Sequence, residues 1–209
     1  MRIIMTSTKF LHLADVHLGK KQYHLKERYN DYYRAFRYVL NVGIEEAVDF
    51  ILICGDLIDS EQSVTPSMLG DIIFSINEFN DKCKVTLGRD IPILCIEGNH
   101  ENPFFSDHTW LKLLTDLKLI ILLSGEYNPQ AKSLTFGSGG KYTVNNICVH
   151  GISYYGTSTS DLYPLIHKEI KKFDNQFNVL MMHFGIAKYD SRKPGEELTQ
   201  SLIDLHENV

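Results

Sequence analysis

Hydrophobic residues in this chain follow two patterns, short continuous runs and longer stretches with helical spacing. The run at 50–54, Phe-Ile-Leu-Ile-Cys, is closed by a glycine and is typical of a parallel strand covered on both faces. Pro66 follows Thr65, which predicts a capped helix start. By the same reasoning we expect strands at 10–14, 50–54, 91–96, 119–122, 147–149 and 179–182, and helices at 31–47, 66–80, 107–117, 162–173 and 195–206.

The order of these elements predicts an α/β fold. Strands alternate with helices in the first half of the chain, whereas the later strands are shorter and less regular. This order favours two sheets packed face to face with helices outside, which is a two-sheet β-sandwich flanked by helices. We expect segments 16–30 and 125–140 to be loops, the second with one short strand, and residues 1–209 to form one domain.

The composition and net charge limit the classes of protein to which this chain could belong. The 209 residues include 44% hydrophobic side chains and carry a formal net charge of −5, so the chain as a whole lacks the basic signature of a nucleic-acid binder. Bound cations and local basic patches can still attract DNA. The four cysteines lack zinc-finger spacing and are expected to be free thiols. Without a signal peptide or a long apolar stretch, we expect no membrane contact and a cytoplasmic protein, nucleoid-associated if its source is prokaryotic.

Polar side chains follow four of the expected strands at the point where each strand ends. They are Asp15 and His17, Asp56 after Gly55, the run Gly98-Asn99-His100-Glu101, and His183. The carboxyl ends of strands in open α/β sheets meet at one crevice, where ligands bind. Carboxylate, imidazole and amide donors suit divalent cations. Taken singly, each motif is common and His183 is more often structural than a ligand, but the ordered set predicts a two-metal site.

The ordered set Asp-x-His, Gly-Asp, Gly-Asn-His-Glu and a later His resembles the calcineurin-like metallophosphoesterase superfamily. Residues 15–19, 27–36 and 48–59 resemble its double-strand-break repair nuclease branch, of the SbcD and meiotic recombination eleven type. The resemblance implies a two-sheet sandwich flanked by helices. It also implies that Asp15, His17 and Asp56 hold a first metal, that Asp56, Asn99 and His183 hold a second, and that His100 assists the leaving oxygen or stabilises the transition state. Mn²⁺ is the favoured ion, with Mg²⁺, Fe²⁺ or Zn²⁺ as alternatives.

Two features depart from that pattern. The family usually has Asp after the Asn-His pair, and this chain has Glu101, which is expected behind His100. The family also has a final strand ending in Gly-His-x-His, whereas here only His206 follows His183. We therefore expect a C-terminally truncated domain whose metal binding and nuclease activity are weakened.

DNA is the substrate that the resemblance implies. Lys20, Lys21, Lys26 and Arg28 stand among tyrosines and are candidate DNA contacts, although a solvated charged loop explains them equally well. The resemblance further implies a partner ATPase of the SMC-like class and a homodimer formed through helices 66–80 and 107–117, with Phe74 as a candidate contact. Asp59 occupies a position that in some relatives is a histidine tied to exonuclease action, so exonuclease and endonuclease modes both stay open.

Two other functions are compatible with these residues. The first is a phosphatase or cyclic-nucleotide phosphodiesterase that acts on small substrates, from the same superfamily. The second is a non-catalytic scaffold that binds DNA and an ATPase. Substitution of Asp56 separates the enzymes from the scaffold, because a scaffold needs no metal.

Overall fold

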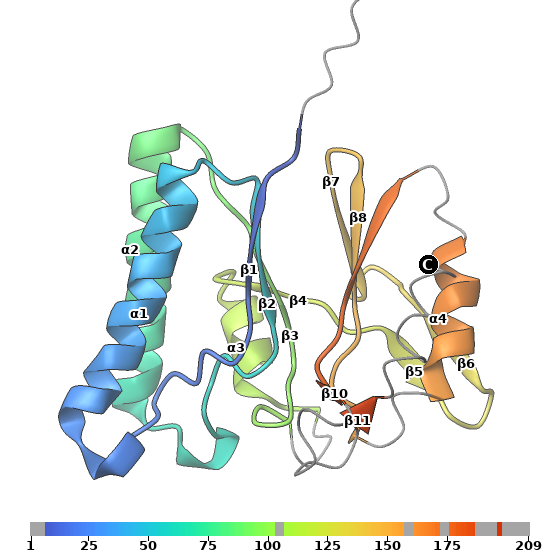
Figure 1. The fold of residues 1–209 in the computed structure, drawn as a ribbon, viewed down its shortest axis with the longest axis horizontal. Helices are drawn as coiled ribbons and strands as arrows, with labels where there is room; N and C mark the ends of the chain where they lie inside the picture. Colours follow the sequence, from blue (N-terminus) through green and yellow to red (C-terminus); the bar gives the residue numbers. More distant parts are fainter. Residues whose placement is uncertain (1–6, 103–106, 157–160, 172–175, 187–195, 198–209) are drawn as a thin grey trace, which may run out of the picture.

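Two β-sheets lie between layers of helices in the computed structural model, which describes residues 7–102, 107–156, 161–171, 176–186 and 196–197 (Figure 1). The first sheet is entirely parallel, with the order β1 (Phe10–Leu13), β2 (Phe50–Cys54), β3 (Ile93–Ile96) and β4 (Ile121–Leu122). The second sheet joins β7 (Lys141–Val144), β8 (Ile147–Gly151) and β9 (Phe177–Met181), with β8 antiparallel to β7 and parallel to β9. Two small pairs complete the strands, β5 (Glu126–Asn128) with β6 (Ser133–Thr135) and β10 (Gly185–Ile186) with β11 (Glu196–Glu197).

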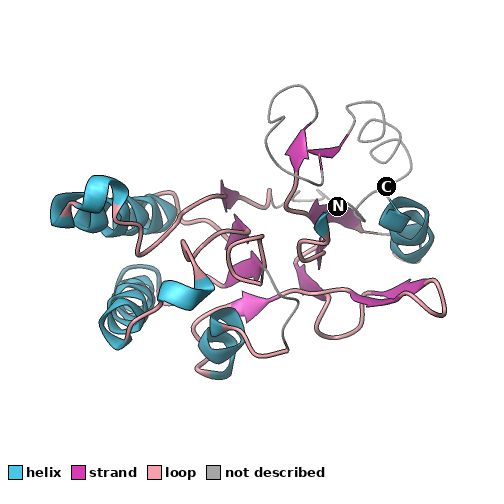
Figure 2. Cartoon of the chain, turned by 90° about the horizontal axis from the view of Figure 1, so that it is seen from below, coloured by secondary structure: helices cyan, strands magenta, loops and turns pink. Residues whose placement is uncertain are grey.

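The helices cover the outer faces of the two sheets, as the view from below also shows (Figure 2). Helices α1 (Lys26–Glu45), α2 (Pro66–Leu87) and α3 (Trp110–Asp116) contribute to one buried cluster with the first sheet. Helix α4 (Tyr163–Ile170) packs with residues of the second sheet and β6 on the other side. Short 3-10 turns, η1 (Gln22–His24) and η2 (Glu61–Ser63), precede α1 and α2.

Side-chain alternation along β2 explains how one strand serves two layers. Ile51 and Ile53 belong to the cluster under the helices, whereas Phe50 and Leu52 belong to the cluster between the sheets. All four are buried, because successive side chains of a strand point to opposite faces and both faces are covered here. The continuous apolar sequence of β2 is therefore the signature of a central strand. The α/β sandwich flanked by helices, which the sequence predicts, is confirmed.

Several element boundaries differ from the sequence-based expectation. Helix α1 begins at Lys26, inside the segment expected to be a loop. The hydrophobic pattern missed this first turn because the turn is polar and carries no apolar spacing. Helix α2 continues past Asn80 and ends where Gly88 adopts a left-handed φ of 67°. The segment 125–140 contains the β5–β6 hairpin, and β7 was not expected at all.

The final expected helix, 195–206, is wrong at its start. Glu196–Glu197 forms β11, which pairs in parallel with β10, so backbone pairing overrides the helical propensity of two glutamates there. The rest of that expected helix, with His206, lies outside the described residues. Among the residues that are described, no helix combines the length and the apolar character needed to cross a lipid bilayer.

The interface between the sheets gives a stability prediction. Leu94 on β3 is fully buried in the cluster between the sheets. Leu94→Ala removes apolar contacts and leaves a cavity, so we expect the free energy of unfolding to fall by about 2–5 kcal/mol in urea denaturation. The matched control is Val85→Ala, since Val85 on α2 is 87% exposed and its truncation is expected to change stability by less than about 0.5 kcal/mol. Equal effects in both variants would contradict this packing.

Candidate metal centre

Apart from His183, which follows β9 of the second sheet, the candidate metal ligands lie where three neighbouring strands of the first sheet end. The loop after β1 carries Asp15 and His17, and its N–H groups donate to the loop after β2: Asp15 N to Gly55 O at 3.2 Å and His17 N to Asp56 O at 2.8 Å. Asp15, His17 and Asp56 have left-handed φ values of 54°, 50° and 54°. Such values are unfavourable for residues with a side chain and concentrate at functional sites. The backbone is thus bent to turn these side chains toward one point.

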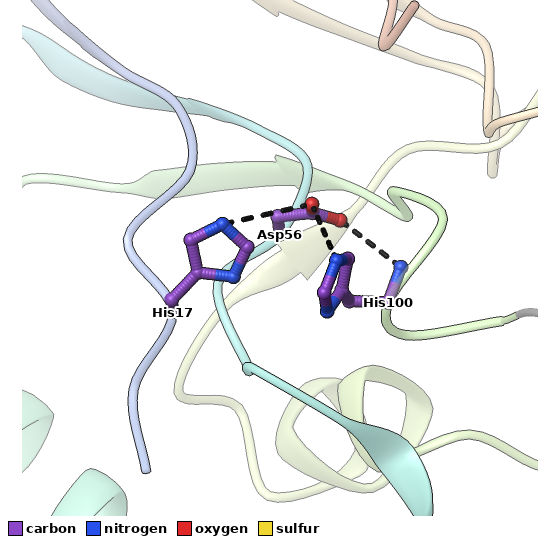
Figure 3. Close-up of side chains that lie close together, drawn as sticks. All are labelled: His17, Asp56 and His100. Carbon is purple, nitrogen blue, oxygen red and sulfur yellow. Dashed lines mark hydrogen bonds and ion pairs between the residues drawn. The ribbon is translucent and has the colours of Figure 1, made fainter. Parts of the chain in front are cut away.

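Asp56 stands at that point and is fully buried. Its Oδ1 accepts the N–H of His100 at 3.1 Å. Its Oδ2 lies 3.9 Å from Nε2 of His17, 3.7 Å from Nε2 of His100 and 3.5 Å from Nε2 of His183 (Figure 3 shows the first two). Among the described residues this Oδ2 finds no hydrogen bond of normal geometry. A buried carboxylate oxygen that faces three ring nitrogens in this way fits a bound cation.

The donor atoms form two groups that share Asp56. One group is His17, Asp56 and His100; the other is Asp15, Asp56 and His183; within each group the donor atoms lie within 4.8 Å of one another. Asn99 adjoins the second group. The structure therefore brings together the side chains that the sequence singled out. The assignment of individual ligands to individual ions remains a prediction.

His183 connects the second sheet to this centre. It follows β9, and its Nδ1 lies 2.9 Å from the carbonyl oxygen of Cys54 at the end of β2. A carbonyl only accepts, so Nδ1 carries a proton and Nε2 is the atom that faces the centre. That Nε2 lies 3.1 Å from Asn99 Oδ1 and 3.5 Å from Asp56 Oδ2, both of which are acceptors. A proton on Nε2 or a bound cation among these three atoms would satisfy both acceptors.

The ionisation of these groups follows the same electrostatics. Burial opposes ionisation of Asp56, but contact with His183 and then with His100 outweighs it and lowers the pKa of Asp56. Burial acts to lower the pKa of His183, but Asp56 outweighs it and the pKa is raised. His17 lowers the pKa of Asp15. The centre thus favours the charged form of its carboxylates.

Two glycines allow the strand ends to approach. A Cβ on Gly98 would lie 2.1 Å from Asp56 Oδ1, and a Cβ on Gly55 would lie 2.5 Å from His183 Nδ1. Gly55 also has a left-handed φ of 85°. Both positions accept only glycine without displacing a candidate ligand.

Glu101 holds the strand-end loops together. It is 2% exposed, and its carboxylate accepts the backbone N–H groups of Asp56 at 3.0 Å, Ile58 at 2.8 Å and Gly98 at 2.9 Å. Burial raises the pKa of Glu101 to about 7, with the charge of Asp56 adding to the increase and the N–H donors opposing it. The sequence suggested a contact with His100, whereas the described hydrogen bonds of the Glu101 carboxylate are with backbone N–H groups.

The four candidate DNA contacts fall into two groups. Lys21 and Lys26 line a cavity of about 470 Å³ at the start of α2. Lys20 lies 3.2 Å from Asp59 Oδ1, and Arg28 bonds with Gln22 and Asp31.

Sequence reasoning missed Tyr154 beside the centre. Its ring centroid lies 6.1 Å from that of His183, and it lines a second cavity, of about 820 Å³, together with Glu97. Nothing in the local sequence pattern distinguishes Tyr154 from Tyr155, so only the packing of β8 against β3 could have revealed it.

Comparison with known proteins gives one family and a consistent set of relatives. The family described as calcineurin-like phosphoesterase matches residues 8–208. The chain is similar to the DNA double-strand break repair protein Mre11 of Sulfolobus acidocaldarius, with 28% identity over 183 residues, 87% of this chain and 42% of that protein. The corresponding values for Mre11 are 30%, 88% and 42% in Sulfurisphaera tokodaii, and 34%, 91% and 28% in Methanosarcina acetivorans. The chain thus spans less than half the length of these relatives.

The role of Glu101 can be tested by stability. Glu101→Ala leaves three buried N–H groups without this acceptor, at about 1–3 kcal/mol each, so we expect the free energy of unfolding to fall by at least about 3 kcal/mol. Glu101→Gln keeps one carbonyl oxygen and is expected to lose less. Glu78→Ala is the control, because that side chain pairs only with Lys82 on the surface of α2 among its described ion pairs. Urea denaturation measures the free energy of unfolding of all three variants. A decrease below about 1 kcal/mol for Glu101→Ala would show that Glu101 does not hold the strand-end loops together.

Proposed function

Because the chain belongs to the calcineurin-like phosphoesterase family, we propose that it is the two-metal phosphodiesterase core of a DNA double-strand-break repair nuclease. The observation that carries the proposal is Asp56 Oδ2, a buried carboxylate oxygen shared by two groups of metal-ligating side chains. Similarity to Mre11 repair proteins over nearly nine tenths of the chain supports DNA as the substrate class.

Five residues would hold the two ions: Asp15, His17, Asp56, Asn99 and His183. Their oxygen and imidazole donors, without a thiolate, favour Mn²⁺ and also admit Mg²⁺, Fe²⁺ or Zn²⁺. When bound, such a pair of ions supplies a water of lowered pKa and positive charge for the phosphate.

His100 would act on the phosphodiester from the open side of the site. Its side chain is 32% exposed, whereas Asp56 beneath it is fully buried. Its Nδ1 contacts the backbone carbonyl of Asp59, which can only accept a hydrogen bond. Nε2 is thus the atom left to face the substrate, where in its protonated form it donates to the leaving oxygen or to a non-bridging oxygen.

We further propose how the substrate and partners meet this core. Lys21 and Lys26 line a cavity that would hold a DNA phosphate near the start of α2. Phe74 is 60% exposed on α2, with the guanidinium of Arg37 5.6 Å from its ring centroid, and would contact a second copy in a homodimer. An SMC-like ATPase would be the partner in the repair complex, and the assembly would work in the cytoplasm or on the nucleoid.

Substitution of the shared ligand tests this function. Asp56→Asn keeps the size of the side chain but removes the charge that both ions share, so we expect Mn²⁺ binding in calorimetry to be lost. Mn²⁺-dependent hydrolysis of an oligonucleotide should fall by more than about a hundredfold, since several kcal/mol of charge stabilisation is removed. Asp31→Asn on α1, where the carboxylate pairs with Arg28 and Arg34, is the matched control.

The outcomes separate the competing functions. A scaffold would bind DNA with and without Asp56 and hydrolyse nothing. A phosphatase or cyclic-nucleotide phosphodiesterase would cleave small phosphoesters without inhibition by DNA. Chelation of the metal should abolish hydrolysis of DNA, and added Mn²⁺ should restore it; hydrolysis that survives chelation would exclude the two-metal mechanism.

Charge reversal tests the DNA contact. Lys21→Glu with Lys26→Glu should weaken DNA binding and make the slope of log K against log salt shallower by about 2, since each lost phosphate contact removes about 0.9 from the slope of B-DNA. The control is Lys82→Glu on α2, where Lys82 is not among the residues that line the cavity and pairs with Glu78. Fluorescence anisotropy at several salt concentrations measures the slope, and an unchanged slope would show that the two lysines form only a solvated charged surface.

A further inference from the structure

Asp59 contacts both histidines of one donor group through two different parts of the residue. Its carboxylate Oδ1 lies 3.3 Å from Nδ1 of His17. Its backbone carbonyl oxygen contacts Nδ1 of His100. The residue lies three positions beyond Asp56 and outside the two groups of donor atoms around the centre.

These contacts give the two imidazole rings the same orientation toward the centre. With Nδ1 of each ring facing Asp59, Nε2 of each ring faces Asp56 Oδ2, at 3.9 Å from His17 and 3.7 Å from His100. The ring centroids are 4.8 Å apart with an interplanar angle of 71°. Figure 3 shows the two rings next to each other, each joined by a dashed line to the Asp56 carboxylate. The contacts of Asp59 thus account for the orientation of both imidazole rings.

Asp59 is itself fixed from both sides. Its N–H donates to Leu18 O at 3.0 Å, and the N–H of Leu18 donates to Leu57 O at 2.8 Å, so the loop carrying His17 and the loop carrying Asp59 are joined by their backbones. The ammonium group of Lys20 lies 3.2 Å from the same carboxylate oxygen that faces His17. The position of the carboxylate is therefore fixed by contacts outside the two donor groups.

We propose that Asp59 is a positioning residue that directs Nε2 of His17 toward a metal ion through the negative charge of its carboxylate, while its backbone carbonyl fixes the ring of His100 so that its Nε2 is free to face the phosphodiester. The proposal rests on the proposed two-metal function. A ligating histidine needs an acceptor at its other ring nitrogen, which fixes the ring and increases the basicity of the ligating nitrogen. The Asp59 oxygen lies off the axis of the His17 Nδ1–H bond, so its attraction depends on charge more than on hydrogen-bond geometry.

Asp59 contacts His17 through its side chain and His100 through its backbone, so substitution of its side chain should affect only one of the two histidines. Substitution of Asp59 removes the contact with His17 but leaves the carbonyl that faces His100. Among the described ion pairs Asp59 makes none with Asp15, Asp56 or His183, so substitution reaches the second group only indirectly, through His17. We therefore expect one of two Mn²⁺ ions to bind about tenfold to a hundredfold more weakly in Asp59→Ala, with the other unchanged.

Calorimetry and electron paramagnetic resonance of Mn²⁺ test this on the whole chain. Asp59→Asn is nearly isosteric and keeps the fold, but it lacks the charge, so it should show most of the loss seen in Asp59→Ala. At a Mn²⁺ concentration that fills both sites of the unmodified protein, both variants should show the spectrum of a single uncoupled ion. Asp31→Asn is the control, since Asp31 is similarly exposed (31% against 24%) and also pairs with a basic side chain.

A double-mutant cycle decides whether Asp59 acts through His17. If it does, Asp59→Asn should cause no further loss of Mn²⁺ affinity in a His17→Ala background. Additive losses, unchanged affinity in Asp59→Asn, or equal weakening of both ions would each overturn the proposal. Failure of the unmodified protein to bind two Mn²⁺ ions would instead overturn the proposed function, and with it the role of Asp59.

Discussion

The burial of one negative charge, that of Asp56, is the constraint around which this structure is organised. An isolated carboxylate in a protein interior is strongly unfavourable unless it is paired or coordinates a metal. Here the surroundings offer it imidazole nitrogens from three separate segments and a backbone N–H from His100. His17 and His100 reach Asp56 because parallel strands of the first sheet end side by side and because the loops after β1 and β2 adopt left-handed backbone angles, whereas His183 reaches it from the end of β9 in the second sheet. The fold thus surrounds a buried negative charge with groups that can hold it as an ion pair or share it with a bound cation.

Glu101 is a second buried carboxyl group, and its hydrogen bonds stabilise the loops that carry Asp56. Two buried carboxyl groups would repel each other if both were charged without compensation. Three backbone N–H donors stabilise the charged form of Glu101, while burial and the charge of Asp56 destabilise it. The result is a second acidic group whose role is to connect the loops after β2 and β3. Under the proposed function, Asp56 would bind metal while Glu101 connects the loops, so the two roles fall to two different carboxyl groups.

Much of the site could be predicted from sequence, because its residues follow continuous apolar strands. The sequence pattern predicted that four residues follow strand ends, and the structure brings them together: Asp15, Asp56, Asn99 and His183. Contacts made by backbone atoms could not be predicted, such as the carbonyl of Cys54 that orients His183. The early start of α1 and the β5–β6 hairpin were missed because their polar residues carry little hydrophobic periodicity.

The position of His183 has a consequence for the two sheets themselves. This histidine follows β9 of the second sheet, whereas Asp56 and Asn99 follow strands of the first. An ion held by all three binds well only while the sheets keep their native separation, so its binding free energy adds to the stability of the sandwich. Loading with metal would then act as a non-covalent cross-link between the two halves. Protection of β9 amides against hydrogen exchange would depend on the concentration of free cation.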